Sequence, residues 1–239
     1  DRRSGVCITS MMHIVKNMAK KTVIVDYGVG NLFSISRALS FLGAENEITG
    51  EPNKVVEADR LILPGVGAFG SGMEGLRSRS LIDPIKDHAK SGRPLLAICL
   101  GMQMLMSKGE EFGVHDGLGI IPGNTVPMRS AGSRFEGVKI PHIGWSRLSK
   151  PEDHSGTGID LWKGSIFEGL GEDPYAYFVH SNIVLPSDDA CCIAETDYNG
   201  RFCSALRHKN IYGCQFHPER SGKVGLKILG RFISDTGIQ

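Results

Sequence analysis

The sequence has no surplus of either charge and no apolar run long enough to cross a membrane. It contains 27 Lys and Arg against 26 Asp and Glu, which gives a formal net charge of +1. This balance offers no general attraction for nucleic acid or for an anionic membrane surface. A membrane-spanning helix needs about 20 apolar residues, and no stretch approaches that length. His13 and Lys16 interrupt anything near the start that could form the core of a signal peptide.

The cysteines and histidines also lack the spacings that mark disulfide frameworks and metal sites. The six cysteines include no Cys-x-x-Cys pair, and they stand at positions 7, 99, 191, 192, 203 and 214. In a chain of this size such cysteines are typical of reduced thiols in the cytosol. The eight histidines show no metal-ligand spacing. The sequence therefore predicts a cytoplasmic protein that uses no metal and no other cofactor.

Residues 94–106 form the stretch around which the chain is organised. Its first half is short and wholly apolar, which is typical of a strand buried on both faces of a parallel sheet. Its second half, from Leu100, is rich in good helix formers. Cys99 stands at the junction, and Gly101 allows the backbone to bend there without a Cβ clash. A thiol in that position faces the positive end of a helix, which favours the nucleophilic thiolate. An ordinary buried cysteine is the alternative.

A base for such a nucleophile is found near the other end of the chain. The apolar run from residue 211 to Phe216 indicates a strand, which Pro218 terminates. The proline also favours extended geometry at His217, so that Glu219 lies on the same side as the imidazole. A histidine oriented by a carboxylate is the pair that a catalytic cysteine requires. Alone, this segment could be a surface turn, but its coincidence with the Cys99 junction favours catalysis.

The two segments together resemble the class I (triad) glutamine amidotransferases. The resemblance rests on Ile-Cys-Leu-Gly-Met-Gln at 98–103 and Gln-Phe-His-Pro-Glu at 215–219. Further stretches are similar to the glutaminase subunits of imidazole glycerol phosphate synthases, from histidine biosynthesis. They are residues 26–32, 63–69, 141–145 and 177–181. The resemblance extends from about residue 22 to the end of the chain.

The resemblance implies roles for individual residues. Cys99 would attack the carboxamide of glutamine, His217 would act as acid and base, and Glu219 would orient His217. The residues implied to contact glutamine are Gly65, Gln103, Glu111 and Ser181. For Glu111, which follows another glutamate, a solvated surface position is the alternative.

A glycine-rich loop follows the predicted strand at residues 60–63. Open α/β sheets bind ligands at the carboxyl ends of their strands, so we expect this loop to border the site. Amides of Val66 or Gly67 would join that of Leu100 in an oxyanion hole. The glycines beside Val66 would let an amide reverse its direction. A plain turn is the alternative.

The order of predicted elements indicates an α/β fold. Strands at 22–26, 44–49 and 60–63 alternate with helices at 32–42, 71–79 and 81–90, which predicts an open, mainly parallel twisted sheet with helices on both faces. Gly28 and Gly30 form a tight turn, but Phe33 replaces the third glycine of a dinucleotide-binding fingerprint. An antiparallel β extension is predicted in the second half. Its segments are a strand at 138–145 that ends in a constrained turn, strands at 174–181, 190–196, 201–208 and 211–216, and a closing helix at 221–234.

The resemblance also implies a partner. In the family, the glutaminase forms a heterodimer with a (βα)8-barrel cyclase that receives the ammonia. The residues expected at that interface are Pro141, Ile143, Trp145 and Arg220, although Trp145 could equally belong to the core. Ser146 and Asn182 depart from the family pattern, which commonly has Asn and an aromatic residue there. These departures bear on the identity of the partner more than on the catalytic chemistry at Cys99.

Several functions therefore remain open at this point. The glutaminase subunit described above is the first, and the same glutaminase feeding a different synthase is the second. A stand-alone cysteine hydrolase is disfavoured by the segment around Pro141 and Trp145. A regulatory or scaffold module is disfavoured by the intact catalytic residues. We expect one amidotransferase domain at 21–239, preceded by an unassigned extension at 1–20 that is either native or a remnant of expression.

Overall fold

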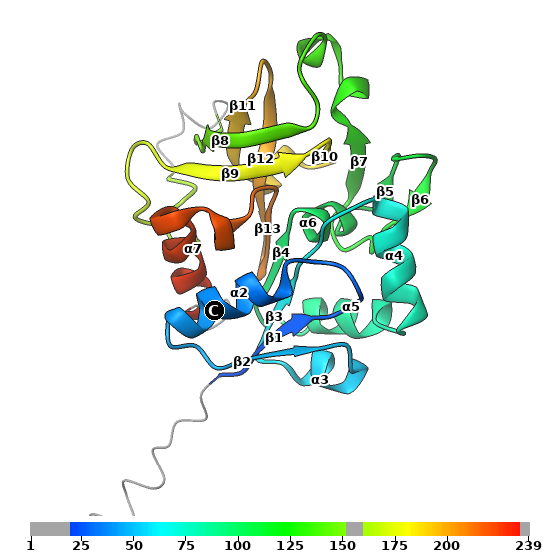
Figure 1. Ribbon diagram of the computed structural model, residues 1–239, viewed down its shortest axis with the longest axis vertical. Coiled ribbons are helices and arrows are strands. Elements are labelled where there is room, and N and C mark those ends of the chain that lie inside the picture. Colours follow the sequence, from blue (N-terminus) through cyan, green and yellow to red (C-terminus); the bar gives the residue numbers. More distant parts are fainter. Residues whose placement is uncertain (1–19, 152–159, 235–239) are drawn as a thin grey trace, which may run out of the picture.

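The computed structural model describes residues 20–151 and 160–234. The predicted N-terminal extension lies outside the described residues, except for Lys20. Within the described part, an 11-stranded mixed sheet and a separate two-stranded sheet form the framework (Figure 1). No helix of this part is both long enough and apolar enough to cross a membrane.

One half of the large sheet is parallel and contains the strands predicted to end at the site. In order across the sheet they are β2 (Asn46–Thr49), β1 (Thr22–Val25), β3 (Arg60–Leu63), β4 (Leu95–Ile98) and β13 (Ile211–Cys214). All neighbours in this series pair in parallel. Because β4 and β13 are adjacent, the segments that follow them, with Cys99 and His217, leave the same edge of the sheet.

Helices cover both faces of the parallel strands. α2 (Leu32–Phe41) and α7 (Gly222–Ser234) pack on one face, and α3 (Pro52–Glu57), α4 (Phe69–Ser78) and α5 (Ile82–Lys90) on the other (Figure 1). Residues alternate between these layers, since Val23 and Val25 face the α5 side while Ile24 faces the α2 side. Alternation of fully buried apolar residues explains why each strand appears as an unbroken apolar run.

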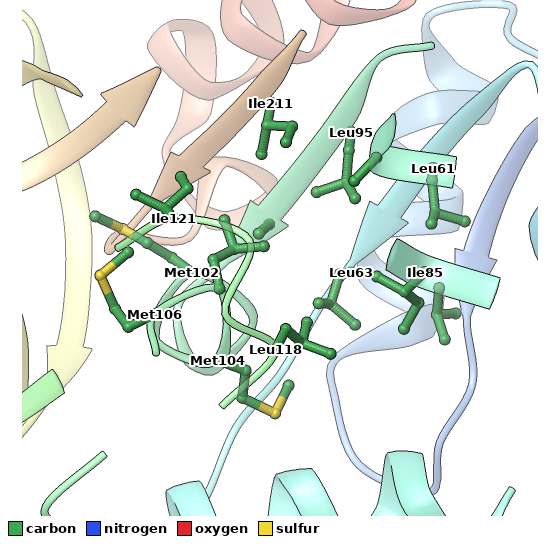
Figure 2. Packing of buried hydrophobic residues seen from close by; sticks show 14 of the residues in the cluster. Leu61, Leu63, Ile85, Leu95, Met102, Met104, Met106, Leu118, Ile121 and Ile211 are labelled. Carbon is green, nitrogen blue, oxygen red and sulfur yellow. The ribbon is translucent and has the colours of Figure 1, made fainter. Parts of the chain in front are cut away.

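The layer on the α5 side holds the short helix that follows Cys99. Leu63 and Leu95 of the central strands pack in one cluster with Met102 and Met104 of α6 (Leu100–Met104) (Figure 2). All of these side chains are fully buried. Burial of each such side chain contributes roughly 1.5–3 kcal/mol. This packing fixes α6 and therefore the position of the cysteine before it.

The other half of the large sheet is antiparallel. From β13 it continues through β12 (Arg201–His208), β10 (Asn182–Pro186), β7 (Gly123–Pro127), β5 (Lys108–Gly109) and β6 (His115–Asp116), while β11 (Cys192–Asp197) pairs with β12. β5 and β7 are the one parallel pair among these described strands. The small sheet pairs β8 (His142–Arg147) with β9 (Tyr175–His180). The predicted fold class, a parallel sheet with an antiparallel extension, is confirmed.

Some local predictions were wrong. The segment 138–145 does not form a strand that ends in a turn, because β8 begins only at His142. Pro141 has no N–H to donate to a ladder, so pairing with β9 starts after it. The helical segment predicted from Leu100 to residue 106 ends at Met104 as α6, and Glu111 follows the short strand β5. The short helix α3, which begins with Pro52, was not predicted.

Candidate active site

The backbone at Cys99 has the geometry of a sharp turn between strand and helix. Its φ of 54° and ψ of −109° lie in a region that non-glycine residues rarely occupy. Residues held there are stabilised by their surroundings and concentrate at functional sites. A Cβ at Gly101 would collide with the carbonyl oxygen of Leu63. The glycine is thus needed for close packing of α6 on β3, which is a different reason from the bend predicted for it.

His217 and Glu219 form a buried pair beside this turn. Nδ1 of His217 lies 2.9 Å from Oε1 of Glu219, and their side chains are 4% and 0% exposed. Because a carboxylate only accepts, Nδ1 carries the proton and Nε2 is left for Cys99. The segment is held in place by β9, since the amide of His217 donates to the carbonyl of Tyr177 at 2.9 Å. Ser221 Oγ donates to the carbonyl of His217 at 2.7 Å.

The surroundings of His217 favour its protonated form. Burial lowers the pKa of His217, but the hydrogen bonds and negative charges of Cys99 and Glu219 outweigh it and raise the pKa to about 10. Nε2 is buried and makes no hydrogen bond among the described residues, and the thiol of Cys99 is directed at the carbonyl oxygen of Val179 at 3.8 Å. Cys99 is nevertheless close enough to His217 to contribute to the rise of its pKa. A cysteine, a histidine and a carboxylate arranged in this way can support nucleophilic catalysis.

Cys99 opens onto a pocket of about 340 Å³. The pocket is lined by Val66, Gly67, Cys99, Leu100, Gln103, Glu111, Pro141, Val179, His180, Ser181 and Asn182. Three of the predicted glutamine contacts, Gln103, Glu111 and Ser181, therefore line the same pocket. The fourth, Gly65, is buried behind the lining, where a Cβ would strike the hydroxyl of Tyr27. Contact of these four residues with glutamine stays a prediction.

The predicted oxyanion residues meet at the pocket, but their amides are not all free. The amide of Leu100 donates to the carbonyl oxygen of Gly65 at 3.4 Å. The loop is fixed at both ends. The hydroxyl of Tyr27 donates to the carbonyl of Pro64 at 2.7 Å, and the amide of Phe69 donates to Glu111 at 2.7 Å. Only the segment between these anchors could reverse a peptide group.

Sequence reasoning missed three residues at the site. Asn31 donates its side-chain amide to Oε1 of Glu219 at 3.4 Å. Tyr27 anchors the glycine-rich loop, as described above, and Gln215 donates to the sulfur of Cys99 at 3.6 Å. Each lies within a stretch that carried the family resemblance, which was the available signal. Among the described residues, no group of three or more His, Cys, Asp and Glu side chains is arranged to hold a metal ion. The absence of a metal cofactor stays a prediction.

Comparison with known proteins agrees with this geometry. The model of the family described as glutamine amidotransferase class-I matches residues 23–235. The chain belongs to the class-I glutamine amidotransferases. It is therefore an enzyme of that family.

Relatives of this amidotransferase share much of its sequence. The imidazole glycerol phosphate synthase subunit HisH 1 of Legionella pneumophila (strain Lens) is 47% identical over 211 residues, which cover 88% of this chain and 97% of the relative. Subunit HisH of Sulfurimonas denitrificans is 48% identical, with 87% and 95% covered. Subunit HisH of Aquifex aeolicus is 42% identical, with 89% and 95% covered.

Solved structures support the fold of the amidotransferase. PurLQS from Thermotoga maritima matches with a TM-score of 0.67 at 20% identity and covers 91% of this chain and 98% of the other. A glutamine amidotransferase from Thermotoga maritima matches with a TM-score of 0.57 at 14% identity, covering 90% and 82%. At these identities the likeness concerns the fold alone.

The predicted interface residues of the amidotransferase lie close to its pocket. Pro141 lines it, whereas Ile143 and Trp145 are 58% and 55% exposed, so that Trp145 is not a core residue. The guanidinium of Arg220 lies 4.6 Å from the ring centre of Tyr177, and Trp145 packs edge-on against the same ring. These aromatic contacts hold Arg220 in a defined position at the surface. Contact with a partner stays a prediction.

A buried pair of histidines connects strand β8 with the wall of the amidotransferase pocket. His142 Nδ1 lies 3.0 Å from His180 Nε2, and His180 Nδ1 lies 2.9 Å from the carbonyl oxygen of Asn182. That carbonyl can only accept, so His180 carries its proton on Nδ1 and His142 donates to His180. Ser146 Oγ, 2.9 Å from His142 Nε2, must then donate. Ser146, a departure from the family pattern, therefore enters this hydrogen-bonded chain through its side chain, whereas Asn182 enters it only through its backbone carbonyl.

This pair predicts a loss of stability in mild acid. Burial lowers the pKa of His142 to about 4 and that of His180 to about 3, whereas unfolding returns each towards 6.5. Because the unfolded chain then binds more protons, the free energy of unfolding falls as the pH drops from about 6.5 towards 4, by about 2 kcal/mol per histidine at pH 5. In His142→Phe, which keeps the ring stacking, urea denaturation at pH 7 and pH 5 should show a smaller fall. An equal fall in both proteins would contradict the prediction.

Proposed function

We propose that this amidotransferase is the glutaminase subunit of an imidazole glycerol phosphate synthase. It hydrolyses glutamine to glutamate and passes the ammonia to a (βα)8-barrel cyclase subunit in histidine biosynthesis. The observation that carries the proposal is the buried pair of His217 and Glu219 acting on Cys99 at the wall of the pocket. Relatives that are 42–48% identical and bear the name of this synthase subunit support the choice of pathway.

The reaction follows from the positions of these side chains. The sulfur of Cys99 attacks the carboxamide carbon of glutamine, and the tetrahedral intermediate collapses as the carbon–nitrogen bond breaks. His217 donates the proton with which ammonia leaves, so a γ-glutamyl thioester remains on Cys99. His217 then takes a proton from water, which attacks the thioester and releases glutamate. Glu219 keeps Nδ1 of His217 protonated throughout and stabilises its positive charge.

Full activity requires a change in the glycine-rich loop. The amide of Leu100 donates to the carbonyl oxygen of Gly65 and is therefore not free to bind an oxyanion. The loop presents a carbonyl there instead of the second amide donor that an oxyanion hole requires. Reversal of the peptide group between Gly65 and Val66 would withdraw the carbonyl and present the amide of Val66. Val66 is 41% exposed, so a docked partner can reach the loop and favour the reversed form.

We predict that the cyclase activates the glutaminase through this loop. The isolated chain should hydrolyse glutamine slowly, and the cyclase with its acceptor bound should raise kcat by about 100-fold, the contribution of one oxyanion donor. KM should change much less. Steady-state ammonia release with and without partner measures the effect. Val66→Pro has no N–H to present, so it should bind the partner without being activated. Equal turnover of the unmodified chain in both states would favour a stand-alone hydrolase.

Reconstitution tests the proposed function itself. The chain is mixed with the cyclase of its own organism, glutamine and the cyclase substrate, and both glutamate and imidazole glycerol phosphate are measured. The proposal predicts a stable heterodimer and equal amounts of both products. Glutamate release without the imidazole product, or failure to bind the cyclase, would reject the histidine pathway but leave the glutaminase intact.

The position of Arg220 provides a matched test of the interface. Arg220→Glu should weaken cyclase binding, because we place this exposed residue opposite an acidic partner side chain. Lys90→Glu makes the same charge change at an exposed position of α5 and should leave binding unchanged. Equal effects of the two variants would show that net charge alone matters.

Two further proposals concern the chain as a whole. Residues 21–239 belong to one amidotransferase domain, and the segment 1–20 stays unassigned. The enzyme acts in the cytosol, a placement supported by the free thiols at Cys99, Cys191, Cys192, Cys203 and Cys214.

A further inference from the structure

Gln215 lies directly behind the proposed nucleophile. It follows the last residue of β13 and is completely buried. Its Nε2 lies 3.6 Å from Sγ of Cys99, and its Oε1 accepts from Nε2 of Gln103 at 3.2 Å. Gln215 is not among the residues that line the pocket. It therefore contacts the nucleophile from the protein side, without occupying the space available to a substrate.

The direction of the Gln215 carboxamide follows from its neighbours. Nε2 of Gln103 lies 3.5 Å from the backbone carbonyl oxygen of Asn182, which can only accept. The amino group of Gln103 must therefore be at that end, and it also faces Gln215. Only the oxygen of Gln215 can accept this second hydrogen bond. Its own amino group is consequently directed at the sulfur of Cys99.

We propose that Gln215 is a positioning residue that stabilises the thiolate of Cys99 by donating a hydrogen bond to the sulfur, with Gln103 and Asn182 fixing its orientation. The inference rests on the proposed function, because a thiolate is needed only if Cys99 is the nucleophile. A donor that faces the charged form of a group favours that form. Gln215 thus acts together with His217, which follows it by two residues in the segment after β13.

Apart from His217, the titratable groups near Cys99 do not supply a donor to the sulfur. They are Glu219 after β13, Tyr27 after β1, His180 in the pocket lining and Cys214, whose carbonyl accepts from the amide of Cys99. The hydroxyl of Tyr27 is committed to the carbonyl of Pro64, and Nδ1 of His180 to that of Asn182. Replacing Gln215 alone leaves all of these groups in place.

The rate at which Cys99 is alkylated, as a function of pH, tests the proposal. The full-length chain and Gln215→Met are treated with iodoacetamide from pH 5 to pH 10, and the modified peptide that contains Cys99 is quantified by mass spectrometry. Methionine keeps the length of glutamine but offers no donor. We expect the midpoint of the profile to rise by about one pH unit, so that alkylation below the midpoint slows about tenfold. The rate at the alkaline plateau should be unchanged, because the thiolate is then fully formed.

A second buried carboxamide, at the opposite end of the same strand, provides the matched control. Asn210 precedes β13 at its other end and is 5% exposed, and its Nδ2 donates to the carbonyls of Ala89 and Arg93. Asn210→Leu removes a buried carboxamide of similar size but should leave the Cys99 profile unshifted. If Gln215→Met does not fold, Gln215→Asn withdraws the donor by one methylene and should shift the midpoint in the same direction.

The outcomes distinguish a failure of the role proposed for Gln215 from a failure of the proposed glutaminase function. An unshifted midpoint in the folded Gln215 variant, or an equal shift in Asn210→Leu, would overturn the role of Gln215. Alkylation requires no glutamine turnover, so a failure of the glutaminase assay would reject the proposed function without affecting this result. In the glutaminase assay, Gln215→Met should lower kcat and leave KM unchanged, because Gln215 does not line the pocket.

Discussion

Cys99→Ala is expected to reduce glutamine hydrolysis to below detection while the protein remains folded. The side chain is small and 6% exposed, so its removal leaves little cavity, and Gln215, which donates to the sulfur, keeps its hydrogen bond with Gln103. It does remove the atom that forms the thioester, and no other residue that lines the pocket carries a thiol. Ammonia release from glutamine in the presence of the cyclase, with thermal unfolding measured in parallel, tests both halves of this expectation.

The neighbouring strand offers a matched control for this variant. Cys214 is also a free and buried thiol, at the end of β13, but does not line the pocket. Cys214→Ala should lose some stability and retain glutaminase activity. The Cys99→Ala complex should still form the imidazole product when ammonia is supplied directly. Measurable glutamine hydrolysis by Cys99→Ala would contradict the covalent mechanism.

His217→Gln is expected to lower kcat by about 10²–10⁴-fold, the usual effect of removing a general acid and base. The imidazole is needed twice, once to protonate the leaving ammonia and once to activate water. KM for glutamine should change less, because His217 does not line the pocket. The kcat and KM of the variant in the complex with the cyclase measure both effects.

Glu219→Gln separates orientation from proton transfer. The amide oxygen can still accept from Nδ1 of His217, but the negative charge that helps to raise the pKa of His217 is lost. We expect a smaller loss of kcat than in His217→Gln. A Glu219→Gln enzyme as active as the unmodified one would show that the carboxylate has no part in the reaction.

Much of the fold, and the meeting of Cys99, His217 and Glu219 at one site, could be predicted from the sequence because their signals are local. Apolar runs marked the parallel strands, and the change from strand to helix pattern at Cys99 marked the turn. The partners of these residues could not be predicted in the same way. Asn31 and Glu219 are 188 positions apart, and Gln103 and Gln215 are 112 apart. Which distant side chains meet depends on strand order and register, and no local pattern records these.

Two features of the site were beyond sequence reasoning for other physical reasons. The direction of the peptide group between Gly65 and Val66 decides whether the amide of Leu100 faces a carbonyl or is free to bind an oxyanion. The glycines of the loop allow either direction. His142 and His180 become a pair only because β8 and β9 align them across the small sheet. Taken one at a time in the sequence, they gave no sign of a shared hydrogen bond.

Labelling with a reactive glutamine analogue tests whether Cys99 is the nucleophile that attacks bound glutamine. The analogue carries a chloromethyl ketone in place of the side-chain carboxamide, so that only a nucleophile beside bound substrate displaces the chloride. We expect one label per chain on Cys99, loss of glutaminase activity in proportion to labelling, and protection by glutamine. Inactivation with the label on another residue, or full activity after Cys99 is labelled, would contradict this role of Cys99.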